Sequence, residues 1–195
     1  MEFFVNNNKL DITLENEKTI GDVLRSFEEE CAKNNATTIK VIINGKTMRA
    51  EDFDSVGSQE INDSTKLELT VISQDDISEN FKNIKLRCQE IAPSLQEISV
   101  KLQTGKDKEA NALIAQLADL LDNFCHTASL SSLFPDKFKE LLIDGKSFSD
   151  FFADFTQILN DFEQAIASKD TVLIGDLSEY EISPRLLAIA DAIKE

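Results

Sequence analysis

The sequence predicts an α+β protein in two parts, a sheet-and-helix domain over residues 1–74 and an all-α helical bundle over residues 75–195. Up to residue 73, apolar side chains recur with a period of two, which is typical of strands that bury one face. Beyond it they recur every three or four residues, as in amphipathic helices. The longest such seam alternates spacings of four and three at Ile77, Phe81, Ile84, Cys88, Ile91, Leu95, Ile98 and Leu102.

The first part opens with two predicted strands. Alternating apolar residues indicate one strand over 1–5 and a second over 10–14, joined by a turn at Asn6-Asn7-Asn8. In the second strand Leu10, Ile12 and Leu14 would share one buried face. A helix should follow, because Thr19 and Asp22 have the spacing of a capping box.

Three further strands are expected. The β-branched run over 38–43 predicts one, and Asn44-Gly45 is a strong hairpin signal that should fold a short strand back through Met48. Alternating Leu67, Leu69 and Val71 indicate the last strand.

This order of elements is that of a β-grasp, and the residues themselves resemble ubiquitin. The resemblance rests on residues 11–15 with 19–23, on residues 42–46 and on residues 64–69, which are similar to ubiquitin's second strand and helix start, its third strand and turn, and its last strand. It implies a ubiquitin-like β-grasp domain. The chain lacks ubiquitin's Gly-Gly tail and runs directly into a helix, so conjugation is not expected. Of ubiquitin's apolar receptor-binding patch, Ile42 alone keeps an apolar side chain, which makes it a candidate partner-binding residue.

The second part should contain four helices. Pro93 lies inside the first seam, but the apolar register continues past it, so one long kinked helix is predicted over 77–102. A second helix should follow the short connection at Gly105 and run antiparallel to the first. Ser147 and Asp150 form a capping box for a third. A fourth helix uses an apolar row with a proline at Pro184, and the row consists of Leu173, Leu177, Tyr180, Leu187 and Ile193.

Short turns between long seams predict an up-down four-helix bundle. The run over residues 169–181 looks like that of uncharacterised bacterial helical-bundle proteins. The bundle is also similar to flagellar secretion chaperones, which are small and helical. The long seams can be satisfied within one chain or across a dimer, so the oligomeric state stays open.

The charge balance excludes several classes of partner. With 36 acidic against 20 basic side chains the formal net charge is −16, and acidic residues are in excess in both parts. Such a surface repels a phosphate backbone and an anionic membrane, so neither nucleic acid nor membrane is expected as a partner. No signal peptide or apolar span is recognisable, and the three cysteines are widely separated, which together predict a cytoplasmic protein with reduced thiols.

Motifs for chemistry are incomplete. Residues 45–47 and 145–147 mimic the end of a phosphate-binding loop, but Lys40 and Glu140 stand where that loop needs its first glycine. The single histidine, His126, has no second ligand at metal-binding spacing. No catalytic, cofactor-binding or metal site is predicted, and the protein is not expected to be an enzyme.

Protein binding is the function that this pattern favours. An adaptor or assembly factor is expected, and a cytosolic chaperone for a secretion or flagellar export substrate is the alternative. The partner would be another protein, such as one with a basic or amphipathic helical segment. The candidate contact residues are Phe148, Phe151, Phe152, Tyr180 and Ile42. For the phenylalanines, packing in the core is the competing interpretation.

Overall fold

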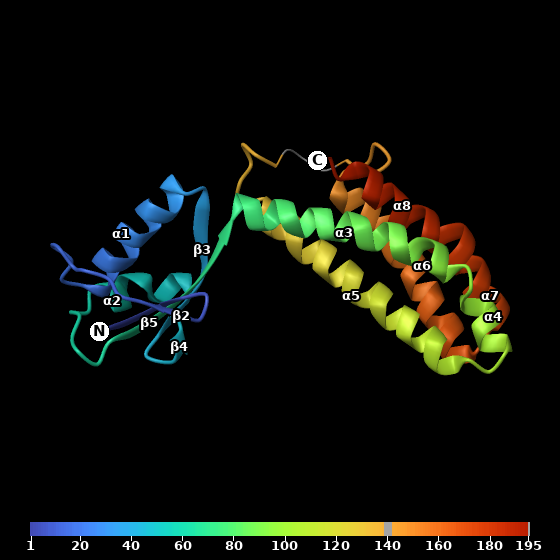
Figure 1. Ribbon diagram of the computed structural model, residues 1–195, viewed down its shortest axis with the longest axis horizontal. Coiled ribbons are helices and arrows are strands. Elements are labelled where there is room, and N and C mark those ends of the chain that lie inside the picture. The colour runs from blue at the N-terminus through green and yellow to red at the C-terminus, as the bar shows by residue number, and fades with distance from the viewer. Residues whose placement is uncertain (139–141, 195) are drawn as a thin grey trace. The chain divides into compact units, whose positions relative to one another are not determined.

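The computed structural model describes residues 1–138 and 142–194, apart from the side chain of Ala50 (Figure 1). It divides into two compact units, Met1–Asp76 and Ile77–Glu195. The first holds a five-stranded sheet and the second is mostly helical, which confirms the α+β class. Within the described ranges, no helix is both long enough and apolar enough to cross a membrane.

The sheet of the first unit has the order β2-β1-β5-β3-β4. Its central contact is the parallel pairing of β1 with β5, and its other pairings are antiparallel. The strands are β1 (Glu2–Val5), β2 (Asn8–Leu10), β3 (Ala36–Ile43), β4 (Lys46–Thr47) and β5 (Lys66–Ser73). Asn6 and Asn7 both adopt positive φ, as the tight turn between β1 and β2 requires.

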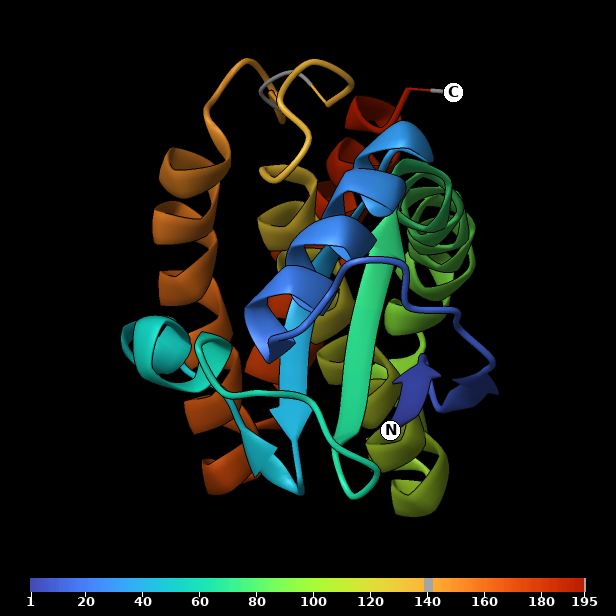
Figure 2. The same cartoon turned by 90° about the vertical axis from the view of Figure 1, so that its left-hand side faces the viewer.

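Helix α1 (Ile20–Lys33) covers one face of this sheet (Figure 2). The predicted capping box starts it, because Thr19 accepts from the Asp22 main chain while the Asp22 carboxylate accepts from Thr19. A 3-10 turn η1 (Ala50–Asp52) and a short helix α2 (Phe53–Gly57) follow β4. The core between helix and sheet consists of Phe3, Ile20, Val23, Leu24, Ile43, Leu67 and Leu69.

The second strand is shorter than the sequence predicts. Strand β2 ends at Leu10, which pairs with Phe3, and residues 11–14 belong to no strand. The antiparallel pairing of β1 with β2 runs from Val5 and Asn8 to Phe3 and Leu10, and the segment after Leu10 leaves the sheet. The prediction of a strand over 10–14 was therefore wrong beyond Leu10.

The second unit is built from long helices whose apolar seams meet in one core. These are α3 (Gln74–Leu95), α4 (Ile98–Gln103), α5 (Asp107–Ser131), α6 (Phe148–Ser168), α7 (Thr171–Asp176) and α8 (Ser183–Ala192), with a π-helical turn η2 (Leu177–Ile182) between the last two. The predicted first seam is inside, since its most central residues are fully buried: Ile77, Ile84, Cys88, Leu95 and Ile98.

The long kinked helix of the prediction is divided in two. Helix α3 ends at Leu95, and α4 begins at Ile98 after two residues of turn. Pro93 has no N–H for the preceding helical turn, and the hydrogen bonds just after it shorten to the three-residue type, from Gln96 to the Pro93 carbonyl. The apolar register nevertheless continues across the break.

Helices α7, η2 and α8 follow one another without a break from Thr171 to Ala192, and we call them together the last helix. Its buried row is Ile174, Ser178, Ile182, Leu186, Ile189 and Ala190. Of the predicted inward row, Leu173, Tyr180 and Leu187 are exposed instead, so the prediction was wrong for these three. Ile193 is buried as predicted and Leu177 is half-buried. The extra residue of the π-helical turn changes which side chains face the core.

Candidate functional site

The phenylalanines predicted as contacts belong to an aromatic cluster in the core of the second unit. The Phe148 and Phe152 rings lie 4.7 Å apart, and both approach Phe124 of α5 within 6 Å, at 5.6 and 5.8 Å. Phe151 is only 4% exposed. Phe148 and Phe152 are half-buried against the same core. These rings pack against one another and against the core, which agrees with the competing interpretation, packing in the core.

Tyr180 has the opposite environment. Its side chain is 65% exposed, on the π-helical turn. A hydrogen bond with Glu179 is the main cause that raises the pKa of its phenol. The ring therefore stands at the surface, beside the Glu179 carboxylate.

Exposed apolar side chains line the last helix on both sides of Tyr180. Leu173 and Leu187 are 41% and 44% exposed, and Val172 is 65% exposed. We define the outer face of the last helix by its exposed residues, which are Val172, Leu173, Asp176, Glu179, Tyr180, Pro184, Leu187 and Asp191. Most of them are apolar, which is unusual for the solvent side of a helix.

Two buried serines and a proline fix this orientation. The hydroxyl of Ser178 donates to the Ile174 carbonyl at 2.7 Å, and that of Ser183 donates to the Ala92 carbonyl of α3 at 2.8 Å. Pro184 has no N–H to give to the Tyr180 carbonyl, so an ordinary α-helical bond is impossible there. The main-chain N–H of Ser183 instead reaches Ser178, five residues back.

The charged members of the outer face are all acidic: Asp176, Glu179 and Asp191. The nearest cation along this helix, Arg185, is half-buried and engaged, with 2.6 Å between its guanidinium and the Glu181 carboxylate. It also lies 6.0 Å from the centre of the Phe155 ring. The outer face thus combines exposed apolar side chains with exposed acidic ones.

Ile42 lies on the sheet of the first unit. It pairs with Glu68 on β5 and Thr47 on β4, and it points away from the core face that its neighbour Ile43 occupies. The adjacent surface is polar, with a Lys66–Glu68 ion pair beside it. Ile42 is half-buried, whereas Tyr180 is exposed, so its environment gives less support to partner binding than that of Tyr180.

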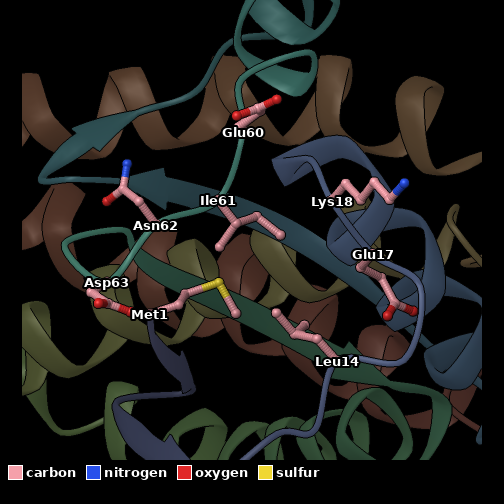
Figure 3. Close-up of a pocket in the computed structure, with 8 residues that line it drawn as sticks. All are labelled: Met1, Leu14, Glu17, Lys18, Glu60, Ile61, Asn62 and Asp63. Atoms are coloured by element: carbon pink, nitrogen blue, oxygen red, sulfur yellow. The ribbon is translucent and has the colours of Figure 1, made fainter.

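A shallow pocket of about 430 Å³ in the first unit was not foreseen. The apolar side chains of Met1, Leu14 and Ile61 converge on it from three different segments, and Glu17, Lys18, Glu60, Asn62 and Asp63 complete its lining (Figure 3). The sequence does place an apolar residue here, because the alternation through Leu14 predicts that the Leu14 side chain lies on the buried face of a strand. The structure leaves that side chain 38% exposed.

The three cysteine thiols are partly or fully buried. Burial raises the pKa of Cys88 to about 12, and it is also the main cause of the raised pKa of Cys31 and Cys125. All three thiols are thus disfavoured as thiolates at neutral pH. Among the described residues, no group of histidine, cysteine or carboxylate side chains is close enough to hold a metal ion.

Comparison with known sequences places both units in families. The family model of the TP0873 N-terminal domain matches residues 1–73, and that of a domain of unknown function, DUF8042, matches residues 79–192. An uncharacterised protein of Treponema pallidum (strain Nichols) is 30% identical over 193 residues, which cover 99% of this chain and 96% of that protein. No solved structure matches. The chain belongs to the DUF8042 family and carries a TP0873-type domain ahead of its DUF8042 domain.

Proposed function

We propose that the protein is a non-catalytic adaptor or assembly factor that binds a partner protein through the outer face of its last helix. The supporting observation is the exposure of Leu173, Tyr180 and Leu187 on one helix whose opposite side is fully buried. Apolar side chains gain little from solvent, and contiguous ones at a surface mark sites of association. A tyrosine at the centre of such a row is a residue type enriched at binding hot spots.

The partner that best fits this face is a basic amphipathic helix. Apolar residues along one side of the partner helix would cover the exposed row. Lysine or arginine side chains at its flanks would meet Asp176, Glu179 and Asp191. A second copy of this acidic chain would bring like charges together, which disfavours self-association through this face.

Finer structural assignments accompany this proposal. A central parallel pair, β1 with β5, and a helix packed on the sheet are features that favour a ubiquitin-like β-grasp for the first unit. Long helices joined by short connections, such as the turn at Gly105, favour an up-down four-helix bundle for the second. Both folds are common in recognition modules, and neither specifies a partner.

A cytosolic chaperone for a secretion or flagellar export substrate is the second candidate. The outer face also suits this role, because it could shield an amphipathic helix of the substrate until export. The two candidates differ in the partner's behaviour, since a chaperone releases its client whereas an assembly factor stays with its complex.

Site-specific photocrosslinking in the full-length protein tests the proposal. A photoreactive phenylalanine analogue replaces Tyr180, and a matched control replaces Leu86, an exposed apolar residue of α3 that is 51% exposed. We expect a crosslink at position 180 to a peptide with apolar residues at helical spacing and an excess of lysine or arginine. The double variant Leu173→Ser/Leu187→Ser should abolish it. Equal yields at both positions, or crosslinked peptides without that pattern, would contradict the proposal.

A further inference from the structure

We propose that the pocket of the first unit is a second protein-binding site, which takes an extended peptide with apolar residues at alternate positions and basic residues between them. This site lies on other residues than the outer face of the last helix, and it does not depend on that proposal. We define the strand-end site as residues 10–14 together with Met1, Ile61 and the acidic lining of the pocket.

The first observation is an unsatisfied pattern. Leu10, Ile12 and Leu14 alternate like the buried face of a strand, yet they are 42%, 39% and 38% exposed. In the parts of the chain that the structure describes, the main chain of residues 11–14 forms no hydrogen bond. Both the side chains and the peptide groups of this segment are thus free to receive a further strand.

The second observation is that the loop at the C-terminal end of this segment is held in place by hydrogen bonds. Glu17 accepts hydrogen bonds from the main chain of Glu15 at 2.9 Å and of Asn16 at 3.1 Å, and from the Ser26 hydroxyl of α1 at 2.8 Å. These bonds lower the pKa of the Glu17 carboxyl to about 2, with that to Ser26 as the largest cause. The carboxylate is therefore charged at neutral pH and fixes the loop that follows Leu14.

The opposite wall of the pocket is also fixed. The main-chain N–H of Ile61 donates to the Lys18 carbonyl at 3.0 Å, and that of Ile20 donates to the Gln59 carbonyl at 3.0 Å. An isolated β-bridge joins Thr19 to Glu60 between them. Met1, Leu14 and Ile61 are thereby presented as a preformed apolar floor, which lowers the entropic cost of binding (Figure 3).

Charge selects the peptide. The pocket lining carries the carboxylates of Glu17, Glu60 and Asp63, whereas Lys18 is its one basic side chain. Asp11 and Glu15 add two more carboxylates on the adjoining segment. A peptide with lysine or arginine between its apolar residues would place cations beside these groups, whereas an acidic peptide would be repelled.

Fluorescence anisotropy on the full-length protein tests this site directly. The probe is a fluorescein-labelled peptide of alternating valine and lysine, and the control peptides alternate valine with glutamate and serine with lysine. We expect the valine–lysine peptide to bind at least about tenfold more tightly than either control. Failure of that peptide to bind, or equal binding of the serine–lysine control, would overturn the proposal.

Matched variants locate the binding. Ile12→Ser should weaken binding of the valine–lysine peptide about tenfold or more, whereas Ile39→Ser, which alters an isoleucine of β3 with the same 39% exposure, should not. Amide chemical shifts of residues 11–14 should move on titration of the labelled wild-type protein, and this readout does not depend on the variants' folding. Equal effects of the two substitutions, or shifts confined to other residues, would refute the assignment.

Discussion

The hydroxyl of Ser183 donates to the carbonyl of Ala92, 2.8 Å away and 91 residues earlier in the chain. Helix α3 ends at Leu95, and the N–H of Gln96, which would ordinarily serve the Ala92 carbonyl, is bonded to Pro93. The serine therefore satisfies a carbonyl that the end of the helix leaves free. This one bond joins the end of α3 to the start of α8.

We expect Ser183→Ala to lower the free energy of unfolding by about 1–3 kcal/mol, because it leaves a buried carbonyl without a donor. The control is Ser129→Ala, which changes an exposed serine of α5 and should have little effect. Chemical denaturation monitored by circular dichroism measures both. Equal stabilities of the two variants would show that the Ser183 bond contributes nothing.

The two kinds of aromatic residue should respond differently to truncation. Phe151→Ala removes a ring that is 4% exposed and should destabilise the second unit by about 3–5 kcal/mol. Tyr180→Ala removes a ring that is 65% exposed and should change stability by less than about 0.5 kcal/mol. Denaturant titrations decide the matter, and a large loss for Tyr180→Ala would mean that this ring serves the fold rather than a partner.

Gly175 allows helices α7 and α4 to approach closely. A Cβ added there would lie 2.7 Å from the Cβ of Ser99, so Gly175→Ala forces the helices apart and should cost about 1–3 kcal/mol. Ser99→Gly removes the opposing atom. In a double-mutant cycle, the second substitution should recover part of the loss, and strict additivity of the two effects would exclude a clash between these residues.

Glu17 should make the first unit sensitive to acid. Its pKa is lowered from 4.5 to about 2 in the folded protein, so its contribution to stability is complete above the unfolded value and is lost as the pH falls toward 2. We expect Glu17→Gln to be less stable than the wild type at pH 7 and the difference to shrink below pH 4.5. Calorimetric unfolding at stepped pH measures this, and a constant difference would contradict it.

The spacing of apolar residues was sufficient to predict the elements in which buried residues recur at a regular interval. The seam from Ile77 to Leu102 is buried as expected, because side-chain spacing alone decides which face of a regular helix is apolar. The capping box at Thr19 starts its helix as predicted, and Ser147 starts the other as an N-cap that accepts from the Asp150 N–H, because these are local hydrogen bonds between residues three apart. At Ser147 the reciprocal bond comes from the hydroxyl to the Asp150 carboxylate instead of from the main-chain N–H.

The errors fall where distant contacts override the local pattern. The end of β2 at Leu10 depends on its pairing with β1. The break between α3 and α4 near Pro93 depends on a distant donor, the Ser183 hydroxyl, for the Ala92 carbonyl. The outward direction of Leu173 and Leu187 depends on a π-helical turn that no simple repeat reveals. The outer face of the last helix and the strand-end site both lie next to these errors. Of the residues that define them, only Tyr180 was predicted from the sequence as a contact residue.

The π-helical turn has a consequence for how changes in length would act on this protein. A π-helical turn holds one residue more than an α-helical turn, so the loss of one residue from Leu177–Ile182 would return this stretch to α-helical geometry and would not rotate α8. A residue lost from a regular α-helix has no such turn to absorb it, and there the following side chains rotate by about 100°. The π-helical turn therefore determines which residues of α8 face outward. The exposure of Leu187 and Asp191 depends on a turn that ends before either of them.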